Sequence, residues 1–400
     1  MIMKVQLVRE EFSWFKNNKG WIYFDNAATS LKPDSVVNAI SEYYQKWSLN
    51  PHNNNTSLSN KLNDIIYETR KKTAQYLAVS ADEIIFNSSA TEILNLFAFG
   101  LNEYLKKGDE IIVNELEHAS NLINWLELSR RNNLKLVLVK SLNEIKDKVN
   151  QKTKLVAFSG LSNIFGYKIN YLDYAKQIKT INKNCLVFID ATQLAAQEKI
   201  VISQNIDGLC FSAHKIFGPT GLGIGYIKKD LQKILNPLKY GGDMYYDFDI
   251  NQKSISLKTN PLKYEAGTNN VAAIYSWSKT LDFINEIYNQ KFQTYKQNLT
   301  TYFKEKIKQQ KKLILINEQA NFPIFLLQIP NIHSQDLAWY LSTKKIITRA
   351  GASCVHLLKK YQKDGYVRVS LSIYNTKEEI DYFFKVIEEF DLKDILNELL

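Results

Sequence analysis

Short apolar runs alternate with segments of helical periodicity between residues 20 and 230. Apolar positions recur at helical spacing after Asp34, which is expected to cap a helix over 34–47, and again over 120–131 and 171–181. The strand-like runs between and around them cover 83–86, 110–113, 155–158, 186–189, 209–211 and 224–227. Strands that alternate with helices predict a mainly parallel sheet, in which ligands bind beyond the carboxyl ends of the strands.

The pattern changes after about residue 280. A long Lys- and Gln-rich helical pattern covers 288–310, short strands are expected at 322–328 and 366–371, and a last helix begins at Lys377. We therefore expect two α/β parts. Residues 21–280 form a large domain, and residues 1–20 and 281–400 form a smaller α+β domain.

The composition is that of a globular protein and changes this picture little. The chain has 400 residues, of which 45% are hydrophobic and 23% charged, which excludes a disordered or fibrous protein. The net charge of +10, taken alone, indicates that the protein binds nucleic acid or an anionic membrane. Only six of the 51 basic residues are arginine, however, so the charge indicates a lysine-rich surface and no nucleic-acid partner.

The cysteines and the N-terminus indicate where the protein is located and whether it binds a metal. Three cysteines without a CxxC pair favour neither a disulfide framework nor a metal site. The first fifteen residues, MIMKVQLVREEFSWF, lack the apolar core of a signal peptide, and no apolar stretch is long enough to span a bilayer. We expect a cytoplasmic protein without a membrane partner.

The most informative segment is FSAHKIFGPTGLGIGYI at 211–227. Lys215 follows a strand directly, between the polar Ser212 and His214 and a glycine-rich turn. Neighbours at such a position can lower the pKa of a lysine, so that its free amine forms a Schiff base. Ser212 and His214 are candidates to contact a phosphate. The alternative is an ordinary surface lysine on a loop.

This segment and YFDNAAT at 23–29 together resemble the class V group of fold-type I enzymes, which use pyridoxal phosphate (PLP). Within that group the sequence is most similar to the group II (SufS-type) cysteine desulfurases and selenocysteine lyases, from about Trp21 to the last helix. The resemblance implies a large PLP-binding domain with a mainly parallel seven-stranded sheet flanked by helices. It also implies a smaller C-terminal α+β domain that carries a cysteine loop.

The resemblance assigns roles around the cofactor ring. Lys215 holds PLP, and Asp190, in IDATQ, pairs with the pyridinium nitrogen and keeps the ring an electron sink. Gln193 hydrogen-bonds the phenolic oxygen, and Asn163 lies near that oxygen and the substrate carboxylate. His118, in ELEHASN, stacks on the ring and moves protons. The alternatives are a strand-end Asp that caps a loop and a structural His.

A phosphate site is expected at the other end of the cofactor. Ala90 and Thr91 fall where a strand gives way to a helix, whose N-terminal N–H groups favour an anion. A simple N-cap by Ser89 or Thr91 is compatible with this site. The resemblance implies that Thr268, in KYEAGTNN, reaches the phosphate of a partner subunit, which requires a homodimer.

The reaction depends on TRAGASCVHLL at 348–358. The resemblance implies that the Cys354 thiolate attacks the sulfur of a PLP-bound cysteine, forming a persulfide and releasing alanine. Cys185 precedes a strand and Cys210 lies inside one, so both are predicted to be buried packing residues.

Arginine is informative because this chain uses lysine for most positive charges. A planar guanidinium can grip a carboxylate in two places. Arg368, in YVRVSLSIYNT, matches the family's substrate-carboxylate arginine, and Arg349 matches a second active-site arginine. A surface salt bridge is the alternative for each.

Some positions depart from the family pattern. His52, expected at the substrate entrance, is followed by Asn53 where group II members commonly have arginine. Ala352 and Ser353 precede the cysteine in place of polar or histidine residues, and Ser89 and Ala90 partly replace the family residues before Thr91. We expect these changes to affect the thiol pKa and the acceptor, and not the reaction class.

The sequence therefore predicts a PLP-dependent cysteine desulfurase. It would convert L-cysteine to L-alanine and pass a Cys354 persulfide to a SufU- or SufE-type protein or a tRNA-thiolation protein, for iron–sulfur cluster assembly or thiolation. Selenocysteine lyase activity fits the same site, and a related aminotransferase would leave Cys354 unexplained. A nucleic-acid-binding or scaffold protein on a degenerate fold is disfavoured by intact Lys215, Asp190, His118 and Cys354.

Overall fold

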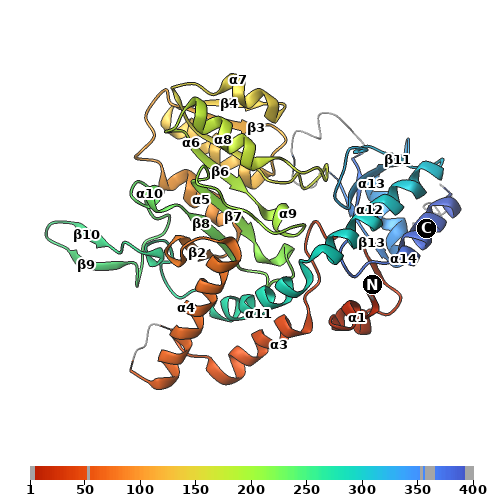
Figure 1. The fold of residues 1–400 in the computed structure, drawn as a ribbon, viewed down its shortest axis with the longest axis horizontal. Helices are drawn as coiled ribbons and strands as arrows, with labels where there is room; N and C mark the ends of the chain where they lie inside the picture. Colours follow the sequence, from red (N-terminus) through yellow and green to blue (C-terminus); the bar gives the residue numbers. More distant parts are fainter. Residues whose placement is uncertain (1–4, 52–54, 352–354, 356–364, 392–400) are drawn as a thin grey trace.

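A seven-stranded sheet forms the centre of the larger part of the molecule (Figure 1). The computed structural model describes residues 5–51, 55–351, 355 and 365–391. The sheet order is β2-β8-β7-β6-β5-β3-β4, and only β8 runs antiparallel to its neighbours. The strands are β2 (Ile84–Asn87), β3 (Glu110–Asn114), β4 (Lys135–Val139), β5 (Thr153–Ser159), β6 (Leu186–Asp190), β7 (Gly208–Ser212) and β8 (Gly223–Ile227). The predicted fold class, with a mainly parallel seven-stranded sheet, is confirmed.

Both faces of this sheet are buried, which explains why its strands read as nearly continuous apolar runs. Successive residues of a strand point to opposite faces, so Ile112 and Val187 join one core while Ile111 and Phe188 join the other. The first core also contains α8 (Tyr171–Ile181) and α11 (Val271–Ile287), and the second contains α5 (Ala90–Gly100) and α6 (Ile123–Asn132).

A smaller antiparallel sheet lies beside the large one, on the right of Figure 1. Phe303, Phe325 and Phe383 belong to its core, and the first two rings stack at 4.1 Å between centroids. The predicted strands and last helix are all present here. The elements are β11 (Ile314–Leu315), β12 (Ile324–Gln328), β15 (Val367–Ser370) and β14 (Arg349–Ala350), with α12 (Gln290–Gln309), α13 (Ser334–Thr343) and α14 (Lys377–Glu389).

The N-terminal segment connects the two sheets. β1 (Ile22–Tyr23) pairs in parallel with β13 (Ile346–Ile347), although more than 300 residues separate them in the sequence. The predicted domain border between residues 280 and 281 falls within α11, which is one continuous helix. The division into residues 21–280 and the remainder stays a prediction.

One predicted helix cap and one predicted helix start were wrong. Helix α3 (Asp34–Glu42) begins at Asp34 with Pro33 before it, and the Asp34 carboxylate instead accepts hydrogen bonds from Ser13 N at 2.8 Å and Ser13 Oγ at 2.7 Å. A π-helical turn (Tyr43–Trp47) follows α3. Helix α6 begins only at Ile123, because a 3-10 turn (Ala119–Asn121) precedes it.

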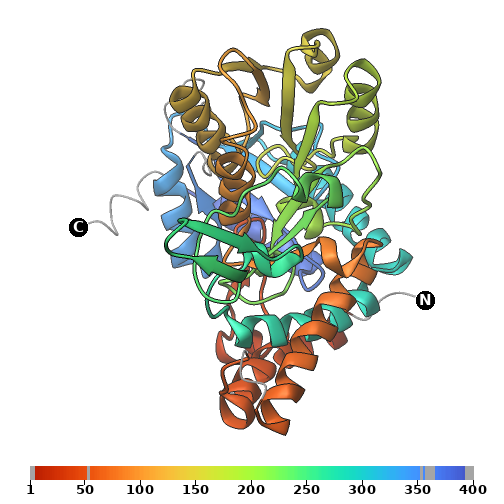
Figure 2. The ribbon, with the colours of Figure 1, turned by 90° about the vertical axis from the view of Figure 1, so that its left-hand side faces the viewer.

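The remaining helices complete the layers. In Figure 2, α3 and the long α4 extend below the sheet. Their bounds are α1 (Val5–Glu10), α2 (Ser13–Asn17), α4 (Ser57–Leu77), α7 (Ile145–Lys148), α9 (Thr192–Ala195) and α10 (Lys229–Gln232). In the part of the chain that the structure describes, no helix combines the length and apolarity that crossing a bilayer requires.

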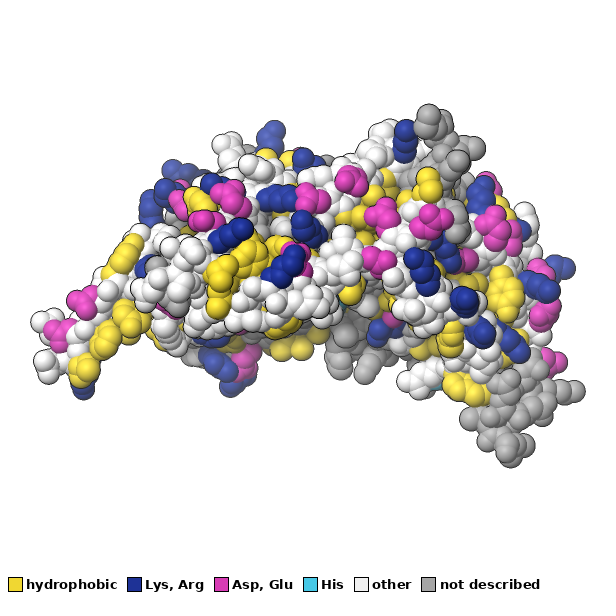
Figure 3. Space-filling view, turned by 90° about the horizontal axis from the view of Figure 1, so that it is seen from below, with side chains coloured by type: hydrophobic (Ala, Val, Ile, Leu, Met, Phe, Trp, Pro, Cys, Tyr) yellow, Lys and Arg dark blue, Asp and Glu magenta, His cyan; other side chains and the backbone are white. Residues whose placement is uncertain are grey.

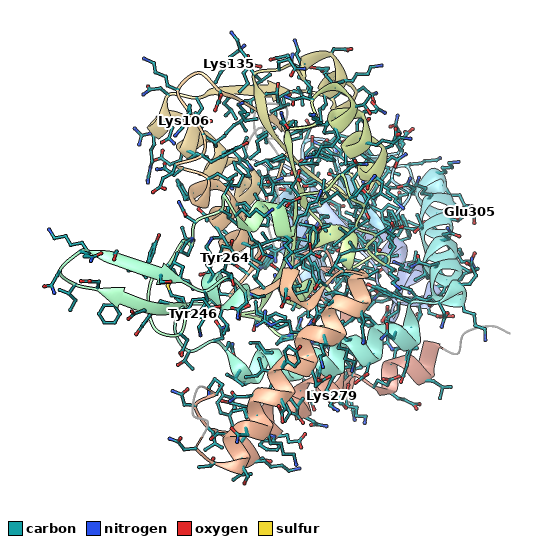
Figure 4. All side chains as sticks on the ribbon, turned by 60° about the vertical axis from the view of Figure 1, so that its left-hand side comes forward. Lys106, Lys135, Tyr246, Tyr264, Lys279 and Glu305 are labelled. Atoms are coloured by element: carbon teal, nitrogen blue, oxygen red, sulfur yellow. The ribbon has the colours of Figure 1, made fainter. Side chains whose placement is uncertain are left out.

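A hairpin that the sequence did not predict projects from the part of the molecule built on the seven-stranded sheet (Figures 1 and 4). It pairs β9 (Tyr245–Asp249) with β10 (Ser254–Leu257) in antiparallel register. Tyr246, which is labelled in Figure 4, is 62% exposed, and Phe248 and Ile255 are also more than half exposed.

Candidate active site

A cavity of about 290 Å³ opens where β5, β6 and β7 end and where α5 begins. Most of the residues that the sequence singled out line it, although they come from segments far apart in the chain. The predicted residues in its lining are Ala90, Thr91, His118, Asn163, Asp190, Gln193, Ser212, His214, Lys215, Arg349 and Arg368. The fold therefore gathers them at the sheet edge where strand topology predicts a ligand.

Lys215 lies on a 3-10 turn (Ala213–Lys215) directly after β7. The carbonyl of the preceding His214 accepts hydrogen bonds from Ser30 N and Thr29 Oγ1, both at 3.0 Å, and from Lys32 Nζ at 2.9 Å. A Cβ on Gly218 would come within 2.9 Å of the Ala213 carbonyl oxygen, so the turn is tightly packed. These contacts fix the backbone that carries the Lys215 amine.

Two histidines near this amine are kept neutral. Burial lowers the pKa of His214 to about 4, with smaller contributions from the charges of Lys215 and Lys32. Burial also lowers the pKa of His118, helped by Lys215 and Arg368 and opposed by Asp190. At neutral pH both imidazoles are therefore uncharged and can accept a proton.

Asp190 ends β6 and is 7% exposed. Its Oδ1 accepts a hydrogen bond from Thr192 N at 2.9 Å, and the carboxylate faces the cavity. A carboxylate in this position can pair with a cationic ring nitrogen.

Polar atoms of Gln193 and Thr192 in the cavity wall are buried and have no hydrogen-bond partner within the described part of the chain. They are Gln193 Oε1 and Thr192 Oγ1. The Gln193 amide nitrogen donates to the Ala27 carbonyl, which holds the side chain in place. Because buried polar groups are nearly always satisfied, these atoms indicate that a polar ligand belongs in the cavity.

The N-terminus of α5 forms the anion-binding end. Ser89 caps the helix by accepting a hydrogen bond from Glu92 N at 3.2 Å. This N-cap is one of the two that the sequence predicted. Ala90 N donates to Ser212 Oγ at 2.9 Å, and Thr91 Oγ1 lies 2.8 Å from Ser120 Oγ. Hydroxyls beside helix N–H groups suit a phosphate.

The two predicted arginines line the cavity from adjacent strands of the small sheet. Arg368, on β15, is 2% exposed and donates to the Asn163 carbonyl at 3.1 Å. Arg349, on β14, has a side chain that is 48% exposed. Both contact the buried carboxylate of Asp25, to which the sequence assigned no role although it lies within the YFDNAAT motif.

Glu117 is a second buried acid that the sequence analysis missed. It accepts hydrogen bonds from Ser159 N and Asn121 Nδ2, both at 2.9 Å, and from Ser159 Oγ. Burial raises the pKa of Glu117 to about 7. The sequence feature that could have indicated Glu117 is its position directly before His118. Its hydrogen bonds fix the loop that carries that imidazole.

Three predicted residues are not part of this lining. Thr268 is exposed and lines a separate depression with Ser88 and Gly221. His52 and Cys354 lie outside the described residues, as do Asn53, Ala352 and Ser353.

The residues present fit PLP. The cavity offers an amine for the aldehyde, a carboxylate for the ring nitrogen and a helix N-terminus for the phosphate. It also leaves the polar atoms of Gln193 and Thr192 to be satisfied by a ligand.

Comparison with known proteins gives a consistent result. The model of the aminotransferase class-V family matches residues 22–383. A probable cysteine desulfurase of Mycoplasma genitalium is 43% identical, and the match covers 98% of this chain and 97% of that protein.

Solved structures are similar over almost the whole chain. The cysteine desulfurase of Thermococcus onnurineus NA1 has a TM-score of 0.90 at 29% identity, covering 97% of this chain and 99% of that one. The cysteine desulfurase CsdA of Escherichia coli has a TM-score of 0.86 at 25% identity, covering 97% and 98% of the two chains.

Proposed function

Because the chain belongs to the aminotransferase class V family, we propose that it is a PLP-dependent cysteine desulfurase that converts L-cysteine to L-alanine. The observation that carries this proposal is a single cavity that combines Lys215, Asp190 and an arginine pair. An amine, a ring-nitrogen partner and a carboxylate clamp are what a PLP enzyme needs to act on an amino acid.

PLP supplies an electron sink for the bond-breaking at the substrate's carbon atoms. Lys215 would hold the cofactor through its amine, and the same amine would take the proton from Cα of the substrate. Asp190 keeps the ring nitrogen protonated, and Gln193 and Thr192 orient the ring through the polar atoms that face the cavity. His118, in the cavity wall, would face the ring and move a proton, for which its neutral imidazole is suited.

The arginine pair binds the carboxylate of cysteine. Arg368 is almost fully buried and anchored to the Asn163 carbonyl, so its guanidinium is held ready before substrate arrives. Arg349 lies directly opposite on the neighbouring strand and adds a second charge. A fixed carboxylate directs the substrate amine toward the site of the cofactor at Lys215.

Cys354 is the proposed nucleophile. Its thiolate attacks the substrate sulfur, so that a sulfur–sulfur bond forms as the carbon–sulfur bond breaks, and the carbon then takes up a proton to give L-alanine. The other two cysteines are fully buried; burial raises the pKa of Cys185 to about 12 and the pKa of Cys210 well above its usual value. Both therefore stay thiols, which supports Cys354 in this role.

The finer assignment follows the sequence resemblance. We place the chain with the group II (SufS-type) enzymes, in the cytoplasm, delivering sulfur to a SufU- or SufE-type protein for iron–sulfur cluster assembly or thiolation. His52 would lie at the substrate entrance.

A homodimer is part of the proposal. The projecting β9–β10 hairpin exposes Tyr246, Phe248 and Ile255, which is costly unless another surface covers them (Figures 3 and 4). Thr268 is exposed and lies outside the cavity of its own chain, as expected of a residue that contacts the cofactor phosphate of a partner.

The nucleophile is tested by trapping the persulfide. The PLP-loaded protein is incubated with L-cysteine, alkylated and digested, and the sulfur adduct is located by mass spectrometry. We expect the adduct on Cys354, and we expect Cys354→Ala to keep the visible absorption of PLP while losing the adduct and L-alanine release.

The matched control is Cys185→Ser, which removes a buried cysteine away from the cavity. It should retain the adduct on Cys354. Full L-alanine production by Cys354→Ala would refute the proposed nucleophile.

A further inference from the structure

Asp25 lies behind the arginine pair and bonds to both members. Arg349 approaches it with Nε at 3.0 Å and Nη2 at 2.9 Å from Oδ2, and Arg368 donates Nη2 to Oδ1 at 3.1 Å. Asp25 is 6% exposed and is absent from the cavity lining, whereas both arginines are part of it. The acid thus supports the pair from the protein side.

The strand register explains why such support is needed. Arg349 and Arg368 are direct cross-strand partners in the antiparallel pair of β14 and β15. Like charges at directly opposite positions repel each other. A carboxylate bonded to both guanidinium groups offsets that repulsion and fixes the position of each group.

The backbone fixes Asp25 firmly. It forms a parallel bridge with Ser370, two residues beyond Arg368 on β15. Asn26 Nδ2 donates to the Ser370 carbonyl at 2.7 Å, and Ala27 N donates to Ser370 Oγ at 2.8 Å. The acid and the strand that carries Arg368 therefore move as one unit.

The charges of the three groups are also matched to the substrate. Two guanidinium groups and one carboxylate leave a net charge of +1, which one carboxylate of an amino acid neutralises. Without the acid, Arg368 would keep its hydrogen bond to the Asn163 carbonyl, while Arg349, whose side chain is half exposed, would lose the bonds that its Nε and Nη2 make to this carboxylate.

We propose that Asp25 is a positioning residue that aligns Arg349 and Arg368 and sets their combined charge for one substrate carboxylate. This inference rests on the proposed function, because it takes the arginine pair as the carboxylate site. It concerns binding of the substrate carboxylate, and Asp25 itself does not touch the reacting atoms.

The test compares two amines that differ by a carboxylate. The PLP-loaded protein is titrated with L-alanine and with ethylamine, and binding is followed by the change in visible absorption. In Asp25→Asn the Kd for L-alanine should rise about tenfold or more, as for the loss of hydrogen bonds between charged groups. The Kd for ethylamine should stay unchanged, and KM for L-cysteine should rise much more than kcat falls.

Two further variants keep the test decisive. Asp25→Glu retains the charge and should recover part of the L-alanine affinity, which a purely structural role would not predict. Glu379→Gln is the matched control, since Glu379 is a buried acid paired with Arg9 at 2.6 Å but lies outside the cavity lining. It should lower stability and leave both affinities unchanged.

The proposal is overturned if Asp25→Asn binds L-alanine as tightly as the wild type, or if the affinities for both amines fall together. A failure of the proposed function looks different. The wild-type protein would then bind PLP and L-alanine but release no alanine from L-cysteine, and the comparison of L-alanine with ethylamine would still test Asp25.

Discussion

Each of the six arginines pairs with a carboxylate, although only two of them line the cavity. The other pairs are Arg9 with Glu379, Arg70 with Glu265, and Arg130 and Arg131 with Glu127. Arg70 and Glu265 form two parallel hydrogen bonds of 2.7 Å in the interior, a geometry that lysine cannot provide. A chain this rich in lysine uses arginine at some positions where geometry matters, and a structural pair looks the same in sequence as a substrate clamp.

A buried lysine gives a pH-dependent prediction. Lys296 is 3% exposed and donates to the carbonyl and side-chain oxygens of Gln197; burial lowers the pKa of Lys296 to about 7, opposed by Glu198. A folded pKa below the unfolded value gives stability that is present at high pH and lost as the pH falls toward the folded pKa. From pH 10 to pH 7 the wild type should therefore lose stability relative to Lys296→Met, by at most about 1.4 kcal/mol per pH unit.

Urea unfolding of both proteins at pH 7.5 and pH 9.5 measures this difference. Lys106→Met, which removes an exposed lysine, controls for the change in net charge. A stability difference between wild type and Lys296→Met that is the same at both pH values would contradict the prediction.

At the residue scale, sequence reasoning works where a site residue follows a strand. Lys215 and Asp190 were singled out from the family resemblance and from their places just past β7 and at the end of β6, and both line the cavity. Asp25 and Glu117 were not singled out, because their roles depend on contacts with residues far away in the chain. Asp25 meets Arg349 only once the small sheet has formed its register.

At the element scale, the approach of β8 to the start of α5 shapes the phosphate end of the cavity. A Cβ on Gly223 would lie 2.3 Å from the backbone of Ser89, the residue that caps α5. Gly223→Ala must displace this helix N-terminus, so it should cost about 1–3 kcal/mol of stability and weaken PLP binding. Thermal unfolding and a PLP titration measure the two effects.

Gly242→Ala is the matched control, because a Cβ there meets nothing within 4 Å. It should leave the Tm and the PLP affinity close to those of the wild type. If Gly223→Ala behaved in the same way, the helix N-terminus would not depend on this close approach.

Helices and strands with a regular pattern of buried apolar residues were predicted well. Helix α8 covers the predicted residues 171–181, and β6 extends the predicted run by only one residue. Strand β4 was missed because it lies at the edge of the sheet and only its last residue is buried. The β9–β10 hairpin was missed although apolar and polar residues alternate along both of its strands, YYDFD and SISL. Its residues are mostly exposed, so the alternation does not mark a face of the core.

At the scale of the whole molecule, the net charge of +10 does not point to one surface. Lys and Arg are interspersed with Asp and Glu on the face drawn in Figure 3, and Lys106, Lys135 and Lys279 lie on separate elements in Figure 4. The mixed surface agrees with the prediction that the charge comes from general use of lysine.

The prediction at this scale concerns the β9–β10 hairpin and the proposed homodimer. Tyr246→Asp places a charge among its exposed apolar side chains and should shift the protein from dimer toward monomer, which sedimentation measures directly. Tyr382→Asp is the control, since Tyr382 is also an exposed aromatic residue but lies on α14. A wild-type protein that sediments as a 46.3 kDa monomer would refute the proposed homodimer.

The central claim is that one cavity holds PLP on Lys215 and uses it to desulfurate L-cysteine. The most direct measurement is the L-alanine formed from L-cysteine by the PLP-loaded protein, beside Lys215→Ala prepared in the same way. We predict that the wild type forms L-alanine over many turnovers in the presence of a reductant, and that Lys215→Ala forms none. L-alanine formation by Lys215→Ala at the wild-type rate, or its absence from both proteins, would contradict the account.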